Sequence, residues 1–424
     1  MPDRFILKAQ QESDTTPSEG ELRISVISDV GMIPIENATV TISYTGDPQQ
    51  PLMTLTTNEN GQTPPVKLPA PDLEYSLEPE QLVQPYSEYN IEVTAPGYES
   101  VLVSGTEVLP DVTAIQPIRM TPLEENAAEE DIFIPVHTLF GEYPPKIPEE
   151  EIKPMDESGE IVLSRVVIPE YVIVHDGVPS DPTAQDYYVR YRDYIKNVAS
   201  CEIYATWPES AIYANILVIM SFTLNRVYTE WYRNQGYDFT ITSSTAYDQK
   251  WIHGRNIFQN IDVLVDNIFA NYLSRPGVRQ PIFTSYCDGK RVTCTGLSQW
   301  GSKYLADEGY TPIEIIRYYY GNDMYINTAS AISGVPSSWP GYNLTIGSSG
   351  QKVQQMQEQL NRIARNYPAL PTLSADGIYG QQTANAVRIF QSIFDLPQTG
   401  VVDYATWYEI SEIYVGVSQI SEPN

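Results

Sequence analysis

Glu202 is the residue of this chain whose surroundings best suit acid–base chemistry. Its neighbours are apolar or aromatic: Ile203, Tyr204 and Trp207. Burial in such surroundings raises the pKa of a carboxyl group, so that the group stays protonated near neutral pH and can donate its proton to a leaving oxygen. The alternative is a structural carboxylate at a helix end, paired with Lys196 or Arg226.

The cysteines are weaker candidates for catalysis. Cys201 stands beside Glu202, but a thiol nucleophile needs a histidine nearby as its base. No spacing pattern links Cys201 to the three histidines: His137, His175 and His253. We therefore interpret Cys201 as buried apolar filler. Cys287 and Cys294 bracket an Asp-Gly turn signal, and their spacing allows a disulfide across a hairpin without requiring one.

Two predicted helices position Glu202. Residues 187–200 have a helical pattern, and residues 208–224 carry apolar side chains on nearly every face, which indicates a helix buried on all sides. Pro208 suits the first helical position, and Glu209 suits the positive end of the helix dipole. Glu202 is therefore predicted at a corner between the two helices.

Two blocks of sequence around this corner carry a family pattern. The first block contains Glu202, Trp207, Pro208, Ala211 and Ala214, with departures at Ile203, Tyr204, Asn215, Met220 and Ser221. The second contains Gly296, Ser298, Gln299, Trp300 and Gly301, followed by IEIIRYYYG. Together the two blocks resemble the catalytic domain of the stage II sporulation protein D (SpoIID) family. The members of this family are peptidoglycan lytic transglycosylases.

The resemblance implies roles for residues in and near these blocks, including some that depart from the family pattern. Glu202 takes the place of the catalytic acid/base. The residues implied to line the saccharide cleft are Tyr204, Trp207, Asn215, Gln249, Ser298, Gln299 and Trp300. Some members bind zinc through His and Cys near residues 246–248, where this chain has Ala, Tyr and Asp. Neither zinc nor another cofactor is therefore expected.

A single carboxyl group is enough for this reaction class. Ordinary glycosidases need two carboxylates, one as acid and one as nucleophile or base. In a lytic transglycosylase the nucleophile is the 6-hydroxyl of the substrate's own N-acetylmuramic acid. One group, Glu202, would protonate the glycosidic oxygen and then deprotonate that hydroxyl as the 1,6-anhydro ring closes.

The charge of the chain excludes some classes of partner. The net charge is −29, with 30 acidic and 7 basic residues in 1–160 against 24 and 18 in 161–424. A chain this acidic is a poor nucleic-acid binder. The first residues, MPDRFILKAQQESD, show no secretory signal, and no uninterrupted apolar stretch of about 18 residues predicts a membrane span.

Patterning divides the rest of the chain into modules. Residues 1–20 are expected to be a disordered N-terminus. Residues 21–122 alternate short strand patterns with turn signals, which predicts a β-sandwich that resembles transthyretin-like or carboxypeptidase-regulatory-like modules. Residues 123–160 are acidic and rich in proline and are expected to form an extended, solvated linker. Residues 161–343 are expected to form an α+β domain similar to that of the SpoIID family.

Residues 344–419 carry the most specific motif. Three helices are predicted from apolar residues spaced three or four apart. The stretch ADGIYGQQTANAVRIFQ between and within the first two helices resembles peptidoglycan-binding domain 1. Gly377 and Gly380 are expected to serve the turn, Thr383 to cap or pack against the second helix, and Phe390 to fill the core.

The fold class expected is therefore multidomain α+β. The order of the three modules resembles that of spore cortex-lytic enzymes from spore-forming bacteria. That resemblance implies a zymogen, located in the cortex or coat region of the spore, whose N-terminal part is removed by an activating protease and whose partner is cortex peptidoglycan. The alternative is a non-catalytic peptidoglycan-binding protein or amidase activator of the same class.

Overall fold

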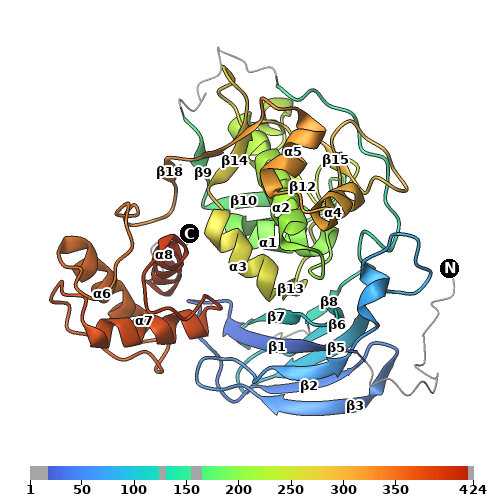
Figure 1. Ribbon diagram of the computed structural model, residues 1–424. Helices are drawn as coiled ribbons and strands as arrows, with labels where there is room; N and C mark the ends of the chain where they lie inside the picture. Colours follow the sequence, from blue (N-terminus) through green and yellow to red (C-terminus); the bar gives the residue numbers. More distant parts are fainter. Residues whose placement is uncertain (1–17, 124–129, 154–164, 419–424) are drawn as a thin grey trace.

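The computed structural model describes residues 18–123, 130–153 and 165–418. Most of the predicted disordered N-terminus, and parts of the predicted linker, lie outside these ranges. The fold is mixed α+β with several sheets. Figure 1 shows three regions: the N-terminal sheets in blue, a middle domain in green to orange, and the C-terminal helices in red beside both.

Two sheets that face one another, here called the N-terminal sandwich, make up the first region (Figure 1). One has the order β3-β2-β5-β6-β8 and the bounds Asp47–Thr56, Thr39–Tyr44, Ser87–Thr94, Val101–Val108 and Glu130–Phe133. The other has the order β13-β7-β1-β4 and the bounds Ile257–Phe258, Thr113–Met120, Glu19–Ser28 and Val66–Pro69. Alternate residues of β1 are buried, as expected for a strand with one face on a core.

Strand β13 belongs to the middle domain in sequence, yet it extends the sandwich. Ile257 and Phe258 pair antiparallel with Ile115 and Ala114 of β7. Next to this strand, the buried guanidinium of Arg255 donates two hydrogen bonds to the carboxylate of Glu107 on β6, at 2.7 and 3.0 Å. The sandwich is therefore part of a continuous structure with the middle domain.

Helix α2, Glu209–Tyr228, is the centre of the middle domain. Its apolar residues are buried on all sides, as the sequence predicts, and Pro208 lies at its N-cap. Among the described residues α2 is the one helix with the length and hydropathy of a membrane span, and 83% of that window is buried inside the protein. Around it lie α1 (Tyr191–Glu202), α3 (Gln259–Ile268), α4 (Gln299–Asp307) and α5 (Pro312–Tyr320).

The expected helix over 187–200 is only partly present. Strand β11, Asp186–Arg190, pairs with β10, Tyr171–His175, and α1 begins at Tyr191. β10 also pairs with β12, Ile241–Thr242. Tyr187 and Val189 suit an extended strand as well as a helix, and pairing with β10 decides between the two.

Short strand pairs complete the middle domain, and among the described residues one 3-10 turn lies in the sandwich and one in the middle domain. The pairs are β9 (Val167–Ile168) with β18 (Ala331–Ile332), β14 (Asn271–Ser274) with β17 (Tyr325–Thr328), and β15 (Tyr286–Cys287) with β16 (Leu297–Ser298). The 3-10 turns are Leu73–Ser76 and Arg233–Gln235. A disulfide joins Cys287 to Cys294. The disulfide that the spacing allows is therefore present, but it closes a loop between two parallel strands and not a hairpin.

The C-terminal domain has the three predicted helices: α6 (Gln351–Ile363), α7 (Gln381–Ile393) and α8 (Tyr404–Ser418). Gly377 has a positive φ of 73°, which explains the glycine at this turn. Gln357 ties the turn to the helices, because its carbonyl accepts from the Gly377 N–H at 2.9 Å and its amide donates to Thr383 at 3.2 Å. Thr383 thus packs inside the domain, and Gly380 takes the N-cap of α7.

A buried cluster of charges joins the C-terminal domain to the middle domain. Arg192 on α1 contacts Glu409 of α8 at 2.8 Å and Asp266 of α3 at 2.9 Å. The cluster contains three cations and four carboxylates: Arg190, Arg192, Lys196, Asp262, Asp266, Glu409 and Glu412. The C-terminal domain is therefore fixed against the middle domain by its third helix.

Candidate active site

Glu202 is the last residue of α1 and is fully buried. Its Oε1 accepts a hydrogen bond from the Lys250 N–H at 2.6 Å, and its Oε2 accepts one from the side-chain amide of Gln299 at 3.2 Å. Neither cation named as a structural partner contacts it. Lys196 pairs with Asp262 and Asp266, and Arg226 pairs with acids elsewhere.

The pKa of Glu202 is raised above its ordinary value, and burial is the main cause. The ammonium group of Lys146 and the hydrogen bond from Lys250 act in the opposite direction. The phenol of Tyr286 lies beside the carboxylate and also lowers its pKa. A carboxyl group with a raised pKa keeps its proton at higher pH, as a general acid requires.

The neighbouring thiol is unsuited to nucleophilic catalysis. Cys201 is buried, and burial raises its pKa to about 12. Its sulfur lies 3.5 Å from the side-chain oxygen of Asn197. The thiolate, which is the nucleophile, is therefore disfavoured.

Three of the predicted cleft residues form an aromatic group behind Glu202. The ring centroids of Trp207 and Trp300 lie 4.9 Å apart, and that of Tyr204 lies 6.0 and 6.1 Å from those of the two tryptophans. The Trp207 indole N–H donates to the carbonyl of Ser76 in the sandwich, at 2.9 Å. All three rings are buried, and each meets the other two edge-on or tilted.

Helix α4 brings Gln299 to Glu202. Ser298 is the N-cap of α4, and its hydroxyl accepts from the Gly301 N–H at 2.9 Å. A Cβ at Gly301 would lie 2.0 Å from the Tyr319 hydroxyl and 2.9 Å from the Ser298 hydroxyl, so any larger residue would displace these two side chains. The second motif thus begins the helix whose first residue, Gln299, donates to the carboxylate of Glu202.

Asn215 and Gln249 have structural partners. Asn215 donates to the Ser302 hydroxyl at 2.7 Å and so links α2 to α4. Gln249 accepts from the Tyr194 and Thr223 hydroxyls at 3.1 and 2.8 Å. Both side chains are buried, and neither has a recorded hydrogen bond to Glu202.

Residues 134–153, here called the strap, run across this region. The Ile147 N–H donates to the Ala246 carbonyl at 2.9 Å, and the Phe283 N–H donates to the Glu151 carbonyl at 3.0 Å. The expectation of a solvated linker is therefore wrong for this part of 123–160. The strap carries several buried residues between its acidic and proline positions: Ile134, His137, Leu139, Tyr143 and Lys153.

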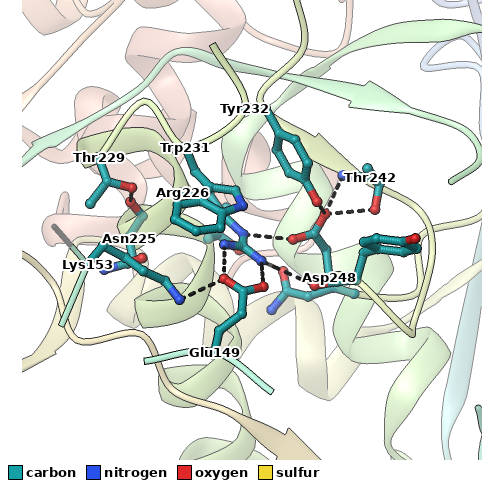
Figure 2. Close-up of polar contacts among 12 residues, drawn as sticks. Glu149, Lys153, Asn225, Arg226, Thr229, Trp231, Tyr232, Thr242 and Asp248 are labelled. Carbon is teal, nitrogen blue, oxygen red and sulfur yellow. Dashed lines mark hydrogen bonds and ion pairs between the residues drawn. The ribbon is translucent and has the colours of Figure 1, made fainter. Parts of the chain in front are cut away.

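Figure 2 shows how the strap is anchored at its C-terminal end. The carboxylate of Glu149 accepts two hydrogen bonds from the buried guanidinium of Arg226, at 2.6 and 2.8 Å, and one from Lys153 at 2.6 Å. On its other side Arg226 pairs with Asp248 at 2.7 Å. Asp248 in turn accepts from the Tyr232 hydroxyl at 2.6 Å.

Three residues near Glu202 were missed by the sequence reasoning: Tyr143, Lys146 and Tyr286. The Lys146 ammonium lies 4.3 Å from the centre of the Tyr286 ring and donates to the Asp248 carbonyl at 2.6 Å. Tyr143 and Lys146 belong to a segment whose composition indicated exposure, and Tyr286 lies in no recognised motif. No sequence signal identified them.

Metal ligands are not grouped in the described part of the chain. No set of three His, Cys, Asp or Glu side chains there has the arrangement of a metal site.

Comparison with protein families identifies the C-terminal domain. A family model described as a putative peptidoglycan-binding domain matches residues 349–410. These residues span α6, α7 and the first half of α8. Peptidoglycan is therefore the partner that the family match supports.

Other comparisons add no family. No curated protein matches the chain. Among solved structures, a catechol 1,2-dioxygenase from Acinetobacter sp. ADP1 matches at 16% identity over 29% of this chain and 60% of its own, with a TM-score of 0.19. A 3-chlorocatechol 1,2-dioxygenase from Rhodococcus opacus 1CP matches at 11% identity over 26% and 62%, with a TM-score of 0.18. This chain thus spans about three fifths of those proteins, and likenesses this slight carry no argument.

Proposed function

We propose that this protein is a peptidoglycan lytic transglycosylase that is made as a zymogen and degrades spore cortex during germination. The middle domain would cleave glycan strands, and the C-terminal domain would hold the enzyme on the wall. The single observation that carries the catalytic part is Glu202, a fully buried carboxyl group whose pKa is raised and whose partners are an amide and a backbone N–H.

In this mechanism Glu202 acts twice. It first donates its proton to the glycosidic oxygen, which leaves as a hydroxyl group. It then takes the proton of the N-acetylmuramic acid 6-hydroxyl, whose oxygen attacks the anomeric carbon and closes the 1,6-anhydro ring. Gln299 and the Lys250 N–H hold the carboxyl group in one orientation through both steps.

The arrangement of domains supports action on an insoluble substrate. A peptidoglycan-binding domain that is fixed to the middle domain raises the effective concentration of glycan strands at the site. The order of modules resembles that of spore cortex-lytic enzymes, which supports the spore location and activation by a protease.

The test is Glu202→Gln in the full chain after cleavage on both sides of the strap, within residues 124–129 and within residues 154–164. Glutamine keeps the shape of the side chain but has no acidic proton, so cleavage should fall by roughly 10² to 10⁴-fold while wall binding is kept. Glu209→Gln, at an exposed position at the start of α2, is the matched control. Mass analysis of fragments released from cortex should detect 1,6-anhydro ends. Cleavage by the Glu202→Gln variant at near the wild-type rate would move the acid elsewhere.

A second function, a non-catalytic peptidoglycan-binding protein or amidase activator, is favoured by one observation. Glu202 has no exposed surface in this form of the chain, so no substrate reaches it. The two functions differ after proteolysis, because an activator would release no glycan fragments by itself and would stimulate an added amidase.

A further inference from the structure

We propose that the surface beneath the strap is the glycan-binding groove of the enzyme, and that strap residues 137–149 occupy it as a built-in competitor of the glycan strand. This inference rests on the proposed function, since it names how the same site binds and excludes its substrate. The segment that covers the groove in the uncut protein is then the strap, which lies between the sandwich and the middle domain in sequence.

The spacing of the strap's inward side chains is the first observation. Tyr143, Lys146 and Glu149 turn toward the middle domain, whereas Glu142 and the three prolines between them are exposed. A period of three residues matches a polyproline II helix, the extended conformation that prolines favour. In that conformation three residues span about 9 Å, so the strap presents one side chain to the groove about every 9 Å. A glycan strand is likewise a stiff linear chain with regularly spaced groups.

The groups that the strap places in the groove are the second observation. Tyr143 is 6% exposed, and its hydroxyl has no hydrogen-bond partner among the described residues although it lies near Glu202 and Asp288. Lys146 lies beside the same acid and above the Tyr286 ring. A polar group aimed at the catalytic acid occupies the place that a scissile bond would need.

The chemistry of the groove floor indicates a glycan. The His137 ring stacks on Tyr204 with centroids 4.5 Å apart, and the Lys146 ammonium covers the face of Tyr286. Sugar rings bind to aromatic faces in the same way, through their C–H surfaces, while amides such as Gln299 bind their hydroxyl and acetamido groups. Removal of the strap would uncover one face of Tyr204, two residues after the acid in sequence, and one face of Tyr286 beside the acid.

Both ends of the strap are clamped. Arg291, in the loop closed by the disulfide, donates to the carbonyls of Thr138 and Gly141. At the other end Glu149 is held by Arg226 (Figure 2). A cut in the chain before or after the strap would leave these contacts in place. Proteolysis on one side of the strap is therefore insufficient, and the strap must also leave the groove.

The experiment uses the uncut full chain and measures amide hydrogen exchange at Thr138 and Ile147, whose N–H groups bond to the middle domain. The probe is soluble, uncross-linked glycan strands released from peptidoglycan by an amidase. Glu149→Gln removes the anchor charge but leaves Arg226 paired with Asp248, and should raise exchange at Ile147 by at least about tenfold. The adjacent, exposed Glu150 provides the control, because Glu150→Gln should leave exchange unchanged.

A second variant removes the competitor itself. Tyr143→Ala combined with Lys146→Ala should let the uncut chain bind the glycan strands at least about tenfold more tightly than wild type. The matched control is Glu142→Ala, which replaces an exposed side chain. Added glycan should further raise exchange in 137–149 of the Glu149→Gln variant, because strap and glycan compete for one groove.

The outcomes separate this inference from the proposed function. If glycan displaces the strap but no variant or cut form cleaves it, the groove assignment stands and the transglycosylase function fails. Suppose instead that the cut protein cleaves glycan, but the strap variants bind glycan no more tightly than wild type and their strap amides exchange hydrogen no faster. The proposed function then stands, and the assignment of the strap to the groove is overturned. Unchanged exchange in the presence of bound glycan likewise overturns it.

Discussion

The sandwich should remain attached to the rest of the protein after the chain is cut between them. We consider a site-specific protease sequence placed within residues 124–129. Beyond that cut, strands β8 and β13 still pair with β6 and β7, and the pair of Glu107 with Arg255 is still buried. The two fragments should therefore elute together in size-exclusion chromatography under native conditions.

Glu107→Gln is the perturbation that measures this contact. The side chains of Glu107 and Arg255 are 1% and 0% exposed, so the substitution leaves a buried guanidinium without its counter-charge. Such a loss costs about 3–5 kcal/mol. At about 1.36 kcal/mol per factor of ten, the dissociation constant of the two fragments should rise roughly 150- to 5,000-fold.

The same interface contains a matched control. Glu78 of the sandwich is exposed, and its carboxylate accepts a hydrogen bond from the Tyr304 hydroxyl of the middle domain at 3.5 Å. Glu78→Gln should therefore change the dissociation constant by less than about fivefold, because exposed contacts of a charged group contribute about 0–1 kcal/mol. Analytical ultracentrifugation of serial dilutions measures all three proteins. If the wild-type fragments separate freely, or if Glu107→Gln and Glu78→Gln have equal effects, the buried pair does not hold the interface.

Three further predictions concern other parts of the molecule. Because the raised pKa keeps Glu202 protonated, cleavage by the cut enzyme should decline as pH rises through that pKa. The pKa of Glu409 is raised to about 8. Its contribution to folding stability is therefore full below about pH 4.5 and should be lost as the pH rises toward 8, which lowers Tm. The Glu409→Gln variant should show a smaller fall in Tm over this pH range. Cys294→Ser should cost about 2–3 kcal/mol of stability and loosen the strap's Arg291 clamp.

Each of these has a result that would contradict it. A cleavage rate that increases steadily with pH would mean that the acting group is a base. An unchanged pH dependence of Tm in the Glu409→Gln variant would mean that another member of the cluster holds the extra proton, since three cations balance only three of the four carboxylates. If amide hydrogen exchange in the strap is equal in wild type and in the Cys294→Ser variant, the disulfide does not support the Arg291 clamp.

The sequence predicted the elements whose pattern is local. Helix α2 was predicted from apolar residues on every face, and α6 to α8 from apolar residues three or four apart, since both follow from helix periodicity alone. The corner that holds Glu202 followed from the two helices on either side. At Asp186–Arg190 the local pattern was ambiguous, and pairing with β10 produced a strand.

The strap and the shared sheet were beyond prediction because they depend on long-range contacts. Glu149 pairs with Arg226, 77 positions later, and Ile257 pairs with Ile115, 142 positions earlier. Acidic and proline-rich composition normally indicates solvated chain. Here an aromatic, a cationic and an anionic side chain at every third position, Tyr143, Lys146 and Glu149, contact the middle domain and bind the segment.

The shared sheet also constrains how the protein is made. Strand β7 leaves the ribosome well before its neighbour β13, because 136 residues separate Met120 from Ile257. At roughly 5–20 residues per second, this part of the edge of the sandwich stays unpaired for about 7–27 s during synthesis. Unpaired edge strands promote aggregation, so the nascent chain is open to edge-to-edge association during this interval of translation.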